Sequence, residues 1–447
     1  MDITRLELSD LLKSDGFKCS CGKFHHTDVE DVVIGHGVLK ELPNYIRKHG
    51  GEKIFLLADQ RTHKAAGKKT EDILCEHEIP YALYIYPHED LEPNELALGQ
   101  VAMNFDEECN LIISIGSGTL NDIGKMLAKI TGRKYMVIAT APSMDGYASN
   151  NSSMISAGIK VTIPSKSPIL ILSDLDVVCQ APVKLLQAGL GDMLAKYISI
   201  CEWRISHLIN SEYYCEQVAD LVRSTVKKCL QSAGDLLKRD SKTIKNIMEG
   251  LILSGIAMSF AGISRPASGV EHYFSHIWDM RALEFQTNSD FHGIQVGIGT
   301  VLALKVYEHI PVLQPNKEKA LDYVARFQYD KHKSFLKEFL GSSASNLILL
   351  EQKEGKYDKT KHYLRLERIL ENWNEIIDII NQELPDLSVV QELLQTVGAP
   401  IDPAFLGFSP ELVKKTFYAT KDIRDKYSVS RLLWDIGELE RIADKVF

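Results

Sequence analysis

The sequence predicts an α/β N-terminal domain built on a parallel, Rossmann-like sheet, followed by an all-α C-terminal domain. Between residues 32 and 176, short apolar runs alternate with longer amphipathic segments, a pattern that is typical of βαβ units and a parallel sheet. After Pro182 the strand-like runs disappear, and apolar residues recur at the helical period through to Phe447. With 447 residues, the chain is long enough for two domains, which we place at residues 1–181 and 182–447.

Five compact apolar runs are expected to form the strands of the sheet, because each is short and is separated from the next by a helical or turn segment. They are residues 53–58, 81–86, 111–115, 135–139 and 169–172. Helices are expected between them at residues 94–105 and 120–129. The stretch 157–172 breaks the alternation, because Pro164 and Pro168 interrupt it, and we interpret its two apolar runs as a hairpin.

The C-terminal half is expected to consist of long helices. Segments with helical periodicity cover residues 184–199, 211–237, 242–262, 315–329 and 362–382. Ser428 is a suitable N-cap for a further helix at residues 432–439, since a serine hydroxyl can accept a hydrogen bond from the first turn. The run 250–262 contains three glycines and predicts a tightly packed, buried helix, which the following Ser-Arg-Pro-Ala-Ser-Gly sequence ends.

Composition argues against several classes of partner. The net charge of −9 disfavours binding to nucleic acid or to an anionic membrane surface. No run of about eighteen apolar residues is present, so no membrane-spanning segment is expected. Eight cysteines are scattered along the chain, and this low density favours a reducing cytoplasm over a disulfide scaffold. We expect a cytoplasmic protein that acts on a small molecule and forms a homodimer or a higher homo-oligomer.

A glycine-containing turn follows the predicted strand 111–115 and opens the next helix. Its sequence from Gly116 to Lys125 is Gly-Ser-Gly-Thr-Leu-Asn-Asp-Ile-Gly-Lys, which brings backbone N–H groups and a helix N-terminus to a place where a pyrophosphate can bind. Asn121 departs from the dinucleotide pattern G-x-G-x-x-G, and Met126 departs from the P-loop pattern. The turn is therefore either a phosphate site or only a tight strand-to-helix connection.

The carboxyl ends of two predicted strands carry polar residues suited to a dinucleotide and a polyol. Asp59 follows the strand 53–58, where a carboxylate can accept hydrogen bonds from the adenosine ribose and disfavour a 2′-phosphate, so it favours NADH over NADPH. The stretch 139–153 is rich in hydroxyl side chains and contains Asp145, which suits a substrate hydroxyl group. The alternative for this stretch is a loop shaped by Asx and serine turns.

Three histidines form a candidate metal site. His272 and His276 lie four residues apart in a helix expected from about Val270, so both imidazoles share one helical face. His292 follows sixteen residues later, beside a glycine. Such imidazoles bind divalent metals when an anionic ligand joins them, and Asp192 is a candidate for that carboxylate. The alternatives are histidines that only decorate a helix and an aspartate that only caps one.

A second cluster, Cys-Ser-Cys-Gly-Lys-Phe-His-His, covers residues 19–26. Cysteine and histidine side chains at this density suit a zinc knuckle, although the Cys-x-Cys spacing lacks the usual two-residue gap and no second cysteine pair follows. The alternative is a solvent-exposed N-terminal lobe without a metal.

Two long motifs, taken in register, resemble one enzyme family. Pro-Ser-Met-Asp-Gly-Tyr-Ala-Ser at residues 142–149 and Ser-Arg-Pro-Ala-Ser-Gly-Val-Glu-His at residues 264–272 closely resemble segments of the sn-glycerol-1-phosphate dehydrogenase family. That family lies within the dehydroquinate-synthase-like superfamily, which includes the iron-containing and other metal-dependent alcohol dehydrogenases. The Cys-x-Cys-Gly segment and residues 419–427 are similar to the bacterial, arabinose-operon-associated branch. The resemblance extends from about residue 19 to 440 and is weakest over residues 328–386.

This resemblance implies a dehydroquinate-synthase-like fold in which Asp192, His272 and His292 hold a divalent metal, usually zinc in the family and nickel in the bacterial branch. It also implies that His276 relays a proton, and that Asp145 binds substrate hydroxyl groups beside Asp192. In this family the turn after the third predicted strand is often Gly-Gly-Gly, and here a serine replaces the middle glycine. The residues implied to contact the dinucleotide, NAD(H) or NADP(H), are Gly116, Ser117, Gly118, Thr119, Leu120, Asp122, Thr140, Ser143 and Ser149.

The activity implied is reversible reduction of dihydroxyacetone phosphate to sn-glycerol 1-phosphate, with hydride transfer at C2 and the metal as a Lewis acid. A phosphorylated substrate needs cationic partners, for which Lys160 and Arg265 are the candidates. Three alternatives stay open: a glycerol or other polyol dehydrogenase without a phosphate pocket, a dehydroquinate-synthase-like lyase that uses NAD transiently, and a catalytically inactive homologue. The presence of all three candidate metal ligands argues against the last alternative.

Overall fold

The computed structural model describes all residues from 1 to 447 except 1–2, 4–7, 13–15, 88–89 and 158. The described chain forms two compact units, each built from two separate segments. Unit 1 consists of Met1–Met193 and Glu216–Ile263, and unit 2 consists of Leu194–Cys215 and Ser264–Phe447.

The two units do not coincide with a single division at residues 181–182. The change near Pro182 marks the end of the strand-containing part of the chain, but two later helices, α10 (Glu216–Ser232) and α11 (Ser241–Ala261), belong to the unit that carries the sheet. A change in periodicity along the sequence reports secondary structure, whereas membership of a unit depends on which faces of the helices pack together.

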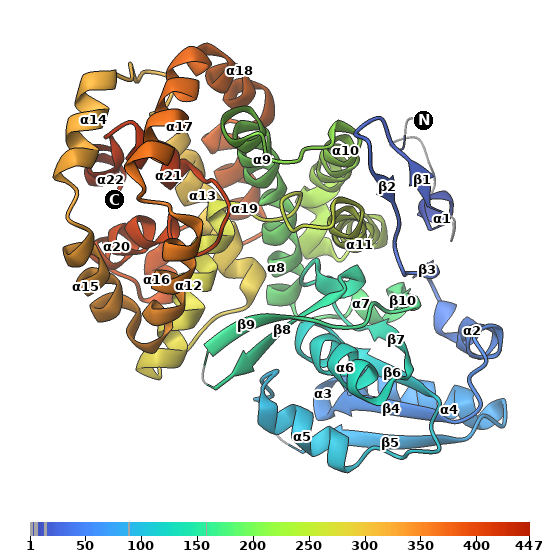
Figure 1. Ribbon diagram of the computed structural model, residues 1–447. Coiled ribbons are helices and arrows are strands. Elements are labelled where there is room, and N and C mark those ends of the chain that lie inside the picture. Colours follow the sequence, from blue (N-terminus) through green and yellow to red (C-terminus); the bar gives the residue numbers. More distant parts are fainter. Residues whose placement is uncertain (1–2, 4–7, 13–15, 88–89, 158) are drawn as a thin grey trace. The chain divides into compact units, whose positions relative to one another are not determined.

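Unit 1 is organised around a six-stranded parallel sheet in the order β3-β10-β7-β6-β4-β5 (Figure 1). All five predicted strands are confirmed, and β3 adds a partly buried edge strand to them. The interior strands are apolar and buried because helices cover the sheet. The strands are β3 (Asp31–Gly35), β4 (Ile54–Asp59), β5 (Tyr81–Tyr86), β6 (Leu111–Gly116), β7 (Lys134–Ala139) and β10 (Leu170–Asp174).

The predicted hairpin within residues 157–172 is wrong. Strand β9 (Ile159–Pro164) pairs antiparallel with β8 (Asn151–Ser156), and β10 joins the main sheet between β3 and β7. The error has a physical reason: β8 has the sequence Asn-Ser-Ser-Met-Ile-Ser, which is too polar to stand out as a strand. Its pairing with β9 satisfies the backbone N–H and C=O groups of β8. The polar composition of β8 gives no sign of this pairing.

The remaining elements of unit 1 are mostly short helices around the sheet. Two small strands, β1 (Phe17–Lys18) and β2 (Phe24–His25), pair antiparallel near the N-terminus. The helices are α1 (Leu8–Leu11), η2 (Val38–Glu41), α2 (Leu42–Lys48), α3 (Gln60–Thr62), η3 (His63–Gly67), α4 (Lys68–Glu76), α5 (Glu95–Met103), α6 (Gly118–Thr131), η4 (Gly146–Ala148), α7 (Leu175–Val178), α8 (Val183–Leu194, its last residue counted with unit 2), α10, η5 (Ala233–Lys238) and α11.

Helix α11 is the predicted buried helix, and it ends at Gly262, whose φ of 71° is the left-handed conformation of a helix C-cap. Among the described residues it is the one helix long and apolar enough to cross a membrane by length and composition. However, 72% of its most apolar window is buried inside the protein, and it packs along α10. Its apolar character is accounted for by this packing.

Unit 2 is helical throughout its described residues. Residues 184–199 and 362–382 were each expected as one helix, but each segment spans two helices, which meet near Ala195 and Asn372. Ser428 occupies the N-cap position of a helix that begins at Val429, earlier than predicted, but its hydroxyl makes no capping hydrogen bond. The helices are α9 (Lys196–Asn210), α12 (Val270–Phe285), α13 (His292–Tyr307), α14 (Lys317–Arg326), α15 (Tyr329–Leu340), η6 (Gly341–Ser343), α16 (Ala344–Glu354), α17 (Lys359–Glu371), α18 (Trp373–Glu383), α19 (Leu387–Thr396), η7 (Pro403–Leu406), α20 (Pro410–Thr420), α21 (Val429–Asp435) and α22 (Leu439–Val446).

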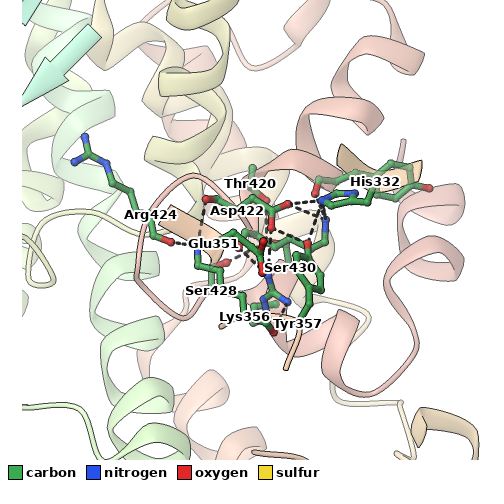
Figure 2. Close-up of polar contacts among 12 residues, drawn as sticks. His332, Glu351, Lys356, Tyr357, Thr420, Asp422, Arg424, Ser428 and Ser430 are labelled. Carbon is green, nitrogen blue, oxygen red and sulfur yellow. Dashed lines mark hydrogen bonds and ion pairs between the residues drawn. The ribbon is translucent and has the colours of Figure 1, made fainter. Parts of the chain in front are cut away.

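A buried polar network around Asp422 joins several of these helices (Figure 2). Its carboxylate accepts a hydrogen bond from Tyr357 Oη at 2.6 Å and lies 2.9 Å from His332 Nε2 and 3.0 Å from Lys421 Nζ. Burial alone favours the neutral acid, but the nearby Lys421 and His332 hold the pKa of Asp422 well below its ordinary value. The loop between α20 and α21 is thereby fixed to α15 by a charge that stays ionised.

Candidate functional site

The sheet of unit 1 has a switch point between β4 and β6. Strand β5 lies on the outer side of β4, and the chain then returns to form β6 on the other side. Open parallel sheets bind ligands beyond the carboxyl ends of the strands at such a point. The register pair Leu57↔Ser114 places the last residues of the two strands, Asp59 and Gly116, at the same edge. The residue predicted for the ribose and the start of the predicted phosphate turn therefore lie on adjacent strands.

The turn between β6 and α6 is tight and opens at this edge. Ser117 is the N-cap residue of α6, and the helix begins at Gly118, so backbone N–H groups of its first turn are suited to bind an anion. A β-carbon at Gly116 would lie 2.5 Å from the side chain of Leu120, which explains why glycine is needed there. Thr140 N–H donates to Gly116 O at 3.1 Å and brings the loop after β7 beside the turn.

Buried Lys125, on α6, holds the loop that follows β7. Its Nζ donates to Asn151 O at 2.5 Å and to Gly146 O at 3.1 Å, and it lies 3.1 Å from Asp122 Oδ1. Burial raises the pKa of Asp122, and attraction to Lys125 offsets this only in part. No role for Lys125 was predictable from the sequence, because its partners are distant backbone carbonyls. Lys125 holds residues 146–151 of the loop, which follow the predicted Asp145 and include the predicted Ser149.

Two buried aspartates of unit 1 share a hydrogen bond. Asp145 N–H donates to Asp192 Oδ2 at 2.9 Å, and Ser254 Oγ donates to Asp145 Oδ2 at 2.9 Å. Asp192 lies in the last turn of α8, so the alternative that it caps a helix N-terminus is excluded. The negative end of the helix dipole opposes a carboxylate at this place. The position therefore suits a carboxylate that meets a cation.

Two glycines let helices approach the loop that carries Asp145. A β-carbon at Gly189, on α8, would lie 1.8 Å from Pro142 O, and one at Gly255, on α11, would lie 2.9 Å from Asp145 O. Both are closer than side chains tolerate. The loop is thus packed between two helices, which orients Asp145.

The three predicted histidines of unit 2 lie together on α12 and α13. The ring centroids of His272 and His292 are 5.1 Å apart, and those of His276 and His292 are 5.8 Å apart. His272 and His292 offer ligand nitrogens within 4.8 Å of each other. The Nδ1 of His272 lies 2.7 Å from Glu271 Oε1, an arrangement that fixes the orientation of the imidazole ring. His292 Nδ1 lies 3.1 Å from Ser275 Oγ.

Comparison with known proteins gives one family. The model of the family described as iron-containing alcohol dehydrogenase matches residues 33–182. Over 413 residues the chain is 28% identical to glycerol-1-phosphate dehydrogenase (NAD(P)+) of Halalkalibacterium halodurans, covering 92% of this chain and 93% of that protein. Over 285 residues it is 33% identical to the protein of the same name from Bacillus velezensis, covering 63% of this chain and 72% of that protein. The chain belongs to the glycerol-1-phosphate dehydrogenase family.

The fold of this glycerol-1-phosphate dehydrogenase family member is also that of a solved alcohol-oxidising enzyme. The crystal structure of glycerol dehydrogenase from Schizosaccharomyces pombe superimposes with a TM-score of 0.59 at 17% identity, covering 96% of this chain and 93% of that one. At this identity the likeness shows the fold alone. It confirms the predicted combination of a parallel α/β sheet with a helical part.

Glu202, for which the sequence predicted no role, shapes the region around the candidate metal ligands of this family member. Glu202 is buried on α9 and accepts hydrogen bonds from the N–H groups of Val270 at 3.0 Å and Val429 at 2.8 Å. Burial, reinforced by Glu271, raises the pKa of Glu202 to about 8. Its one signal in the sequence is an acidic residue within the apolar run of α9. It anchors the N-terminus of α12, the helix whose third residue is His272.

Arg265 does not direct its guanidinium toward the histidines. Within unit 2 its Nε donates to Glu212 Oε1 at 2.7 Å, its Nη1 to Tyr427 O at 2.9 Å and its Nη2 to Ser206 Oγ at 3.1 Å. Arg265 is buried, and these bonds brace the loop before α12.

The sequence predicted a role for Lys160 but none for Lys426. Lys426 also braces the loop before α12, with its Nζ 3.1 Å from Ser264 O and from Ser268 O, and was not singled out. Desolvation, reinforced by Arg265, lowers the pKa of Lys426 to about 7. Lys160, the other predicted phosphate ligand, lies on β9 of unit 1, partly exposed.

Proposed function

We propose that this protein interconverts dihydroxyacetone phosphate and sn-glycerol 1-phosphate, using NAD(H) or NADP(H) as the hydride carrier. The observation that carries the proposal is membership of a family whose relatives bear that name across 92% of this chain. The predicted alternative of an inactive homologue is disfavoured, because His272, His276 and His292 lie together on α12 and α13.

Asp192, His272 and His292 are proposed to hold a divalent metal ion, zinc or nickel. The donor set fits such an ion: two imidazoles offer nitrogens within 4.8 Å of each other, Glu271 orients one of them, and Asp192 adds a buried carboxylate. When bound, the metal supplies Lewis-acid polarisation of the C2 oxygen. Asp192 also helps to position the substrate.

The remaining residues of the site are proposed to position the substrate and move a proton. His276 neighbours both proposed histidine ligands, with ring centroids 6.3 Å from His272 and 5.8 Å from His292. It exchanges a proton with the C2 oxygen as hydride is transferred. Asp145 accepts hydrogen bonds from substrate hydroxyl groups, held for this by Ser254. Lys160 is proposed for the substrate phosphate, whereas we assign Arg265 to bracing the loop before α12.

The dinucleotide is proposed to bind at the switch point of the sheet. Its pyrophosphate meets the turn after β6 and the N-terminus of α6, and its adenosine ribose meets Asp59, which favours NADH. The cofactor supplies hydride chemistry that no side chain provides. The residues proposed to line the cofactor are Asp59, Gly116, Ser117, Gly118, Thr119, Leu120, Asp122, Thr140, Ser143 and Ser149. We further propose that the protein acts in the cytoplasm as a homodimer.

The test is NADH oxidation by zinc- or nickel-loaded protein with dihydroxyacetone phosphate, run beside dihydroxyacetone. His272→Ala is expected to abolish turnover, whereas His309→Ala, a histidine of the same unit outside the cluster, keeps it. Turnover with the phosphorylated ketone alone supports the proposal. Equal turnover with dihydroxyacetone would indicate a polyol dehydrogenase instead. Absence of net NADH consumption with either metal would indicate a dehydroquinate-synthase-like lyase.

A further inference from the structure

A second group of metal-binding side chains lies in the small N-terminal sheet of unit 1. The ligand atoms of Cys19, Cys21 and His25 all lie within 4.8 Å of one another, and Cys21 Sγ is 3.4 Å from His25 Nε2. In a tetrahedral zinc site, a sulfur and a nitrogen ligand are separated by roughly 3.5 Å, given the usual zinc–ligand bond lengths. The three side chains therefore already have nearly the spacing that zinc imposes.

The backbone fold of this segment resembles a knuckle. Strands β1 and β2 pair Phe17 with His25, and between them Cys19 N–H donates to Lys23 O at 3.0 Å while Gly22 N–H donates to Cys19 O at 3.1 Å. Gly22 has a φ of 87°, which glycine adopts readily in a tight turn. Both cysteines lie in this turn, between the two-residue strands. Short spacing between the cysteines is accommodated by this turn geometry.

His25 is oriented as a metal ligand. Its side chain is buried, and its Nδ1 lies 2.7 Å from Phe260 O, so Nδ1 carries the proton and Nε2 faces the thiol of Cys21. The rings of Phe17 and Phe260 pack beside it at centroid distances of 5.2 and 5.7 Å. A buried imidazole with one nitrogen fixed by a carbonyl is the usual state of a structural ligand.

Zinc takes four ligands, so Cys19, Cys21 and His25 leave one coordination position, which a water molecule can fill. None of the three side chains takes part in a disulfide among the described residues.

We propose that Cys19, Cys21 and His25 bind a zinc ion that stabilises the fold of the N-terminal segment, separate from the catalytic metal. Binding converts the two thiols to thiolates and releases their protons to solvent. The knuckle has too few apolar residues for a core of its own, so the ion pins it to α11, where Lys23 Nζ also donates to Ala261 O at 3.2 Å. The site would thereby fix the end of α11, which leads into the loop before His272.

The test uses metal-free full-length protein titrated with cobalt(II), without substrate. Wild type is expected to bind two equivalents, one of which gives the intense near-ultraviolet charge-transfer band of thiolate-bound cobalt. Cys21→Ser should lose this band and keep one equivalent, while His272→Ala should keep the band. Cys75→Ser, a matched change at an exposed cysteine of the same unit, should leave both unchanged.

Several results would overturn the proposal. A wild-type titration without the band, or a band that survives Cys21→Ser, would show that these side chains do not bind the ion. If Cys21→Ser does not fold, wild-type zinc protein is titrated with a thiol-specific reagent, and one equivalent of zinc should be released as the thiolates react. Because no step involves the ketone, failure here is distinguishable from failure of the proposed reaction.

Discussion

Replacing Gly189 with alanine perturbs the packing that supports the loop carrying Asp145. The added β-carbon would lie 1.8 Å from Pro142 O, whereas real β-carbons essentially never come within 3.0 Å of another heavy atom. Helix α8 or the loop must therefore move by roughly an ångström. Overpacking of this kind costs about 1–3 kcal/mol, and the better helix propensity of alanine returns about 0.5–1 kcal/mol. We expect a net loss of about 1–2 kcal/mol.

Thermal denaturation measures the expected loss of stability, and steady-state kinetics measure the effect of the loop displacement on turnover. At about 2–4 °C per kcal/mol for a unit of this size, the Tm should fall by roughly 2–8 °C. A shift of about 1 Å in the loop should also lower kcat with dihydroxyacetone phosphate by up to about 100-fold. Gly99→Ala on α5 is the matched control, because no atom lies within 4 Å of its added β-carbon. A Gly189→Ala variant with wild-type Tm and kcat would refute the packing argument.

Three further predictions follow from single side chains. His276→Ala should lower kcat by about 10²–10⁴-fold while metal analysis still finds the catalytic ion; unchanged kcat would remove its proposed role. Asp59→Ser should shift the ratio of kcat/KM values toward NADPH by about tenfold or more, because a charge-assisted hydrogen bond to the ribose is lost; an unchanged ratio would place the ribose elsewhere. Asp422→Asn should destabilise unit 2 by about 3–5 kcal/mol at neutral pH, because Lys421 loses its buried counter-charge. Since the pKa of Asp422 is depressed in the folded protein, its stabilising contribution is present above about pH 4 and is lost as the pH falls through the folded pKa. Thermal melts across this range should therefore show a weaker acid dependence in the variant, and parallel curves would contradict the assignment.

The strands of the sheet were predictable because their signal is local. Residues 81–86 form β5 with the predicted bounds, since a short apolar run between turns has few other solutions. The polar strand β8 was overlooked because its extended conformation depends on pairing with β9 and not on its own apolar pattern. Helices α10 and α11 were placed with the C-terminal part because the sequence shows that they are helices, and not which unit they join.

The candidate site likewise contains residues that were predictable from a local sequence pattern and residues that were not. His272 and His276 were identified from their spacing on one helix, and His292 from a motif beside a glycine. Glu202 and Lys125 were missed because each is defined by backbone groups far away in the sequence: Val429 N–H for Glu202 and Asn151 O for Lys125. No local pattern distinguishes such buried charges from surface ones.

The central claim is most directly tested by oxidation of the two enantiomers of glycerol phosphate with NAD+ by the metal-loaded protein. The account predicts NADH formation with sn-glycerol 1-phosphate, little or none with sn-glycerol 3-phosphate, and loss of the activity in His272→Ala. Oxidation of sn-glycerol 3-phosphate or of glycerol at an equal or higher rate would contradict the proposed substrate. Absence of NADH formation with all three compounds would contradict the proposed reaction itself.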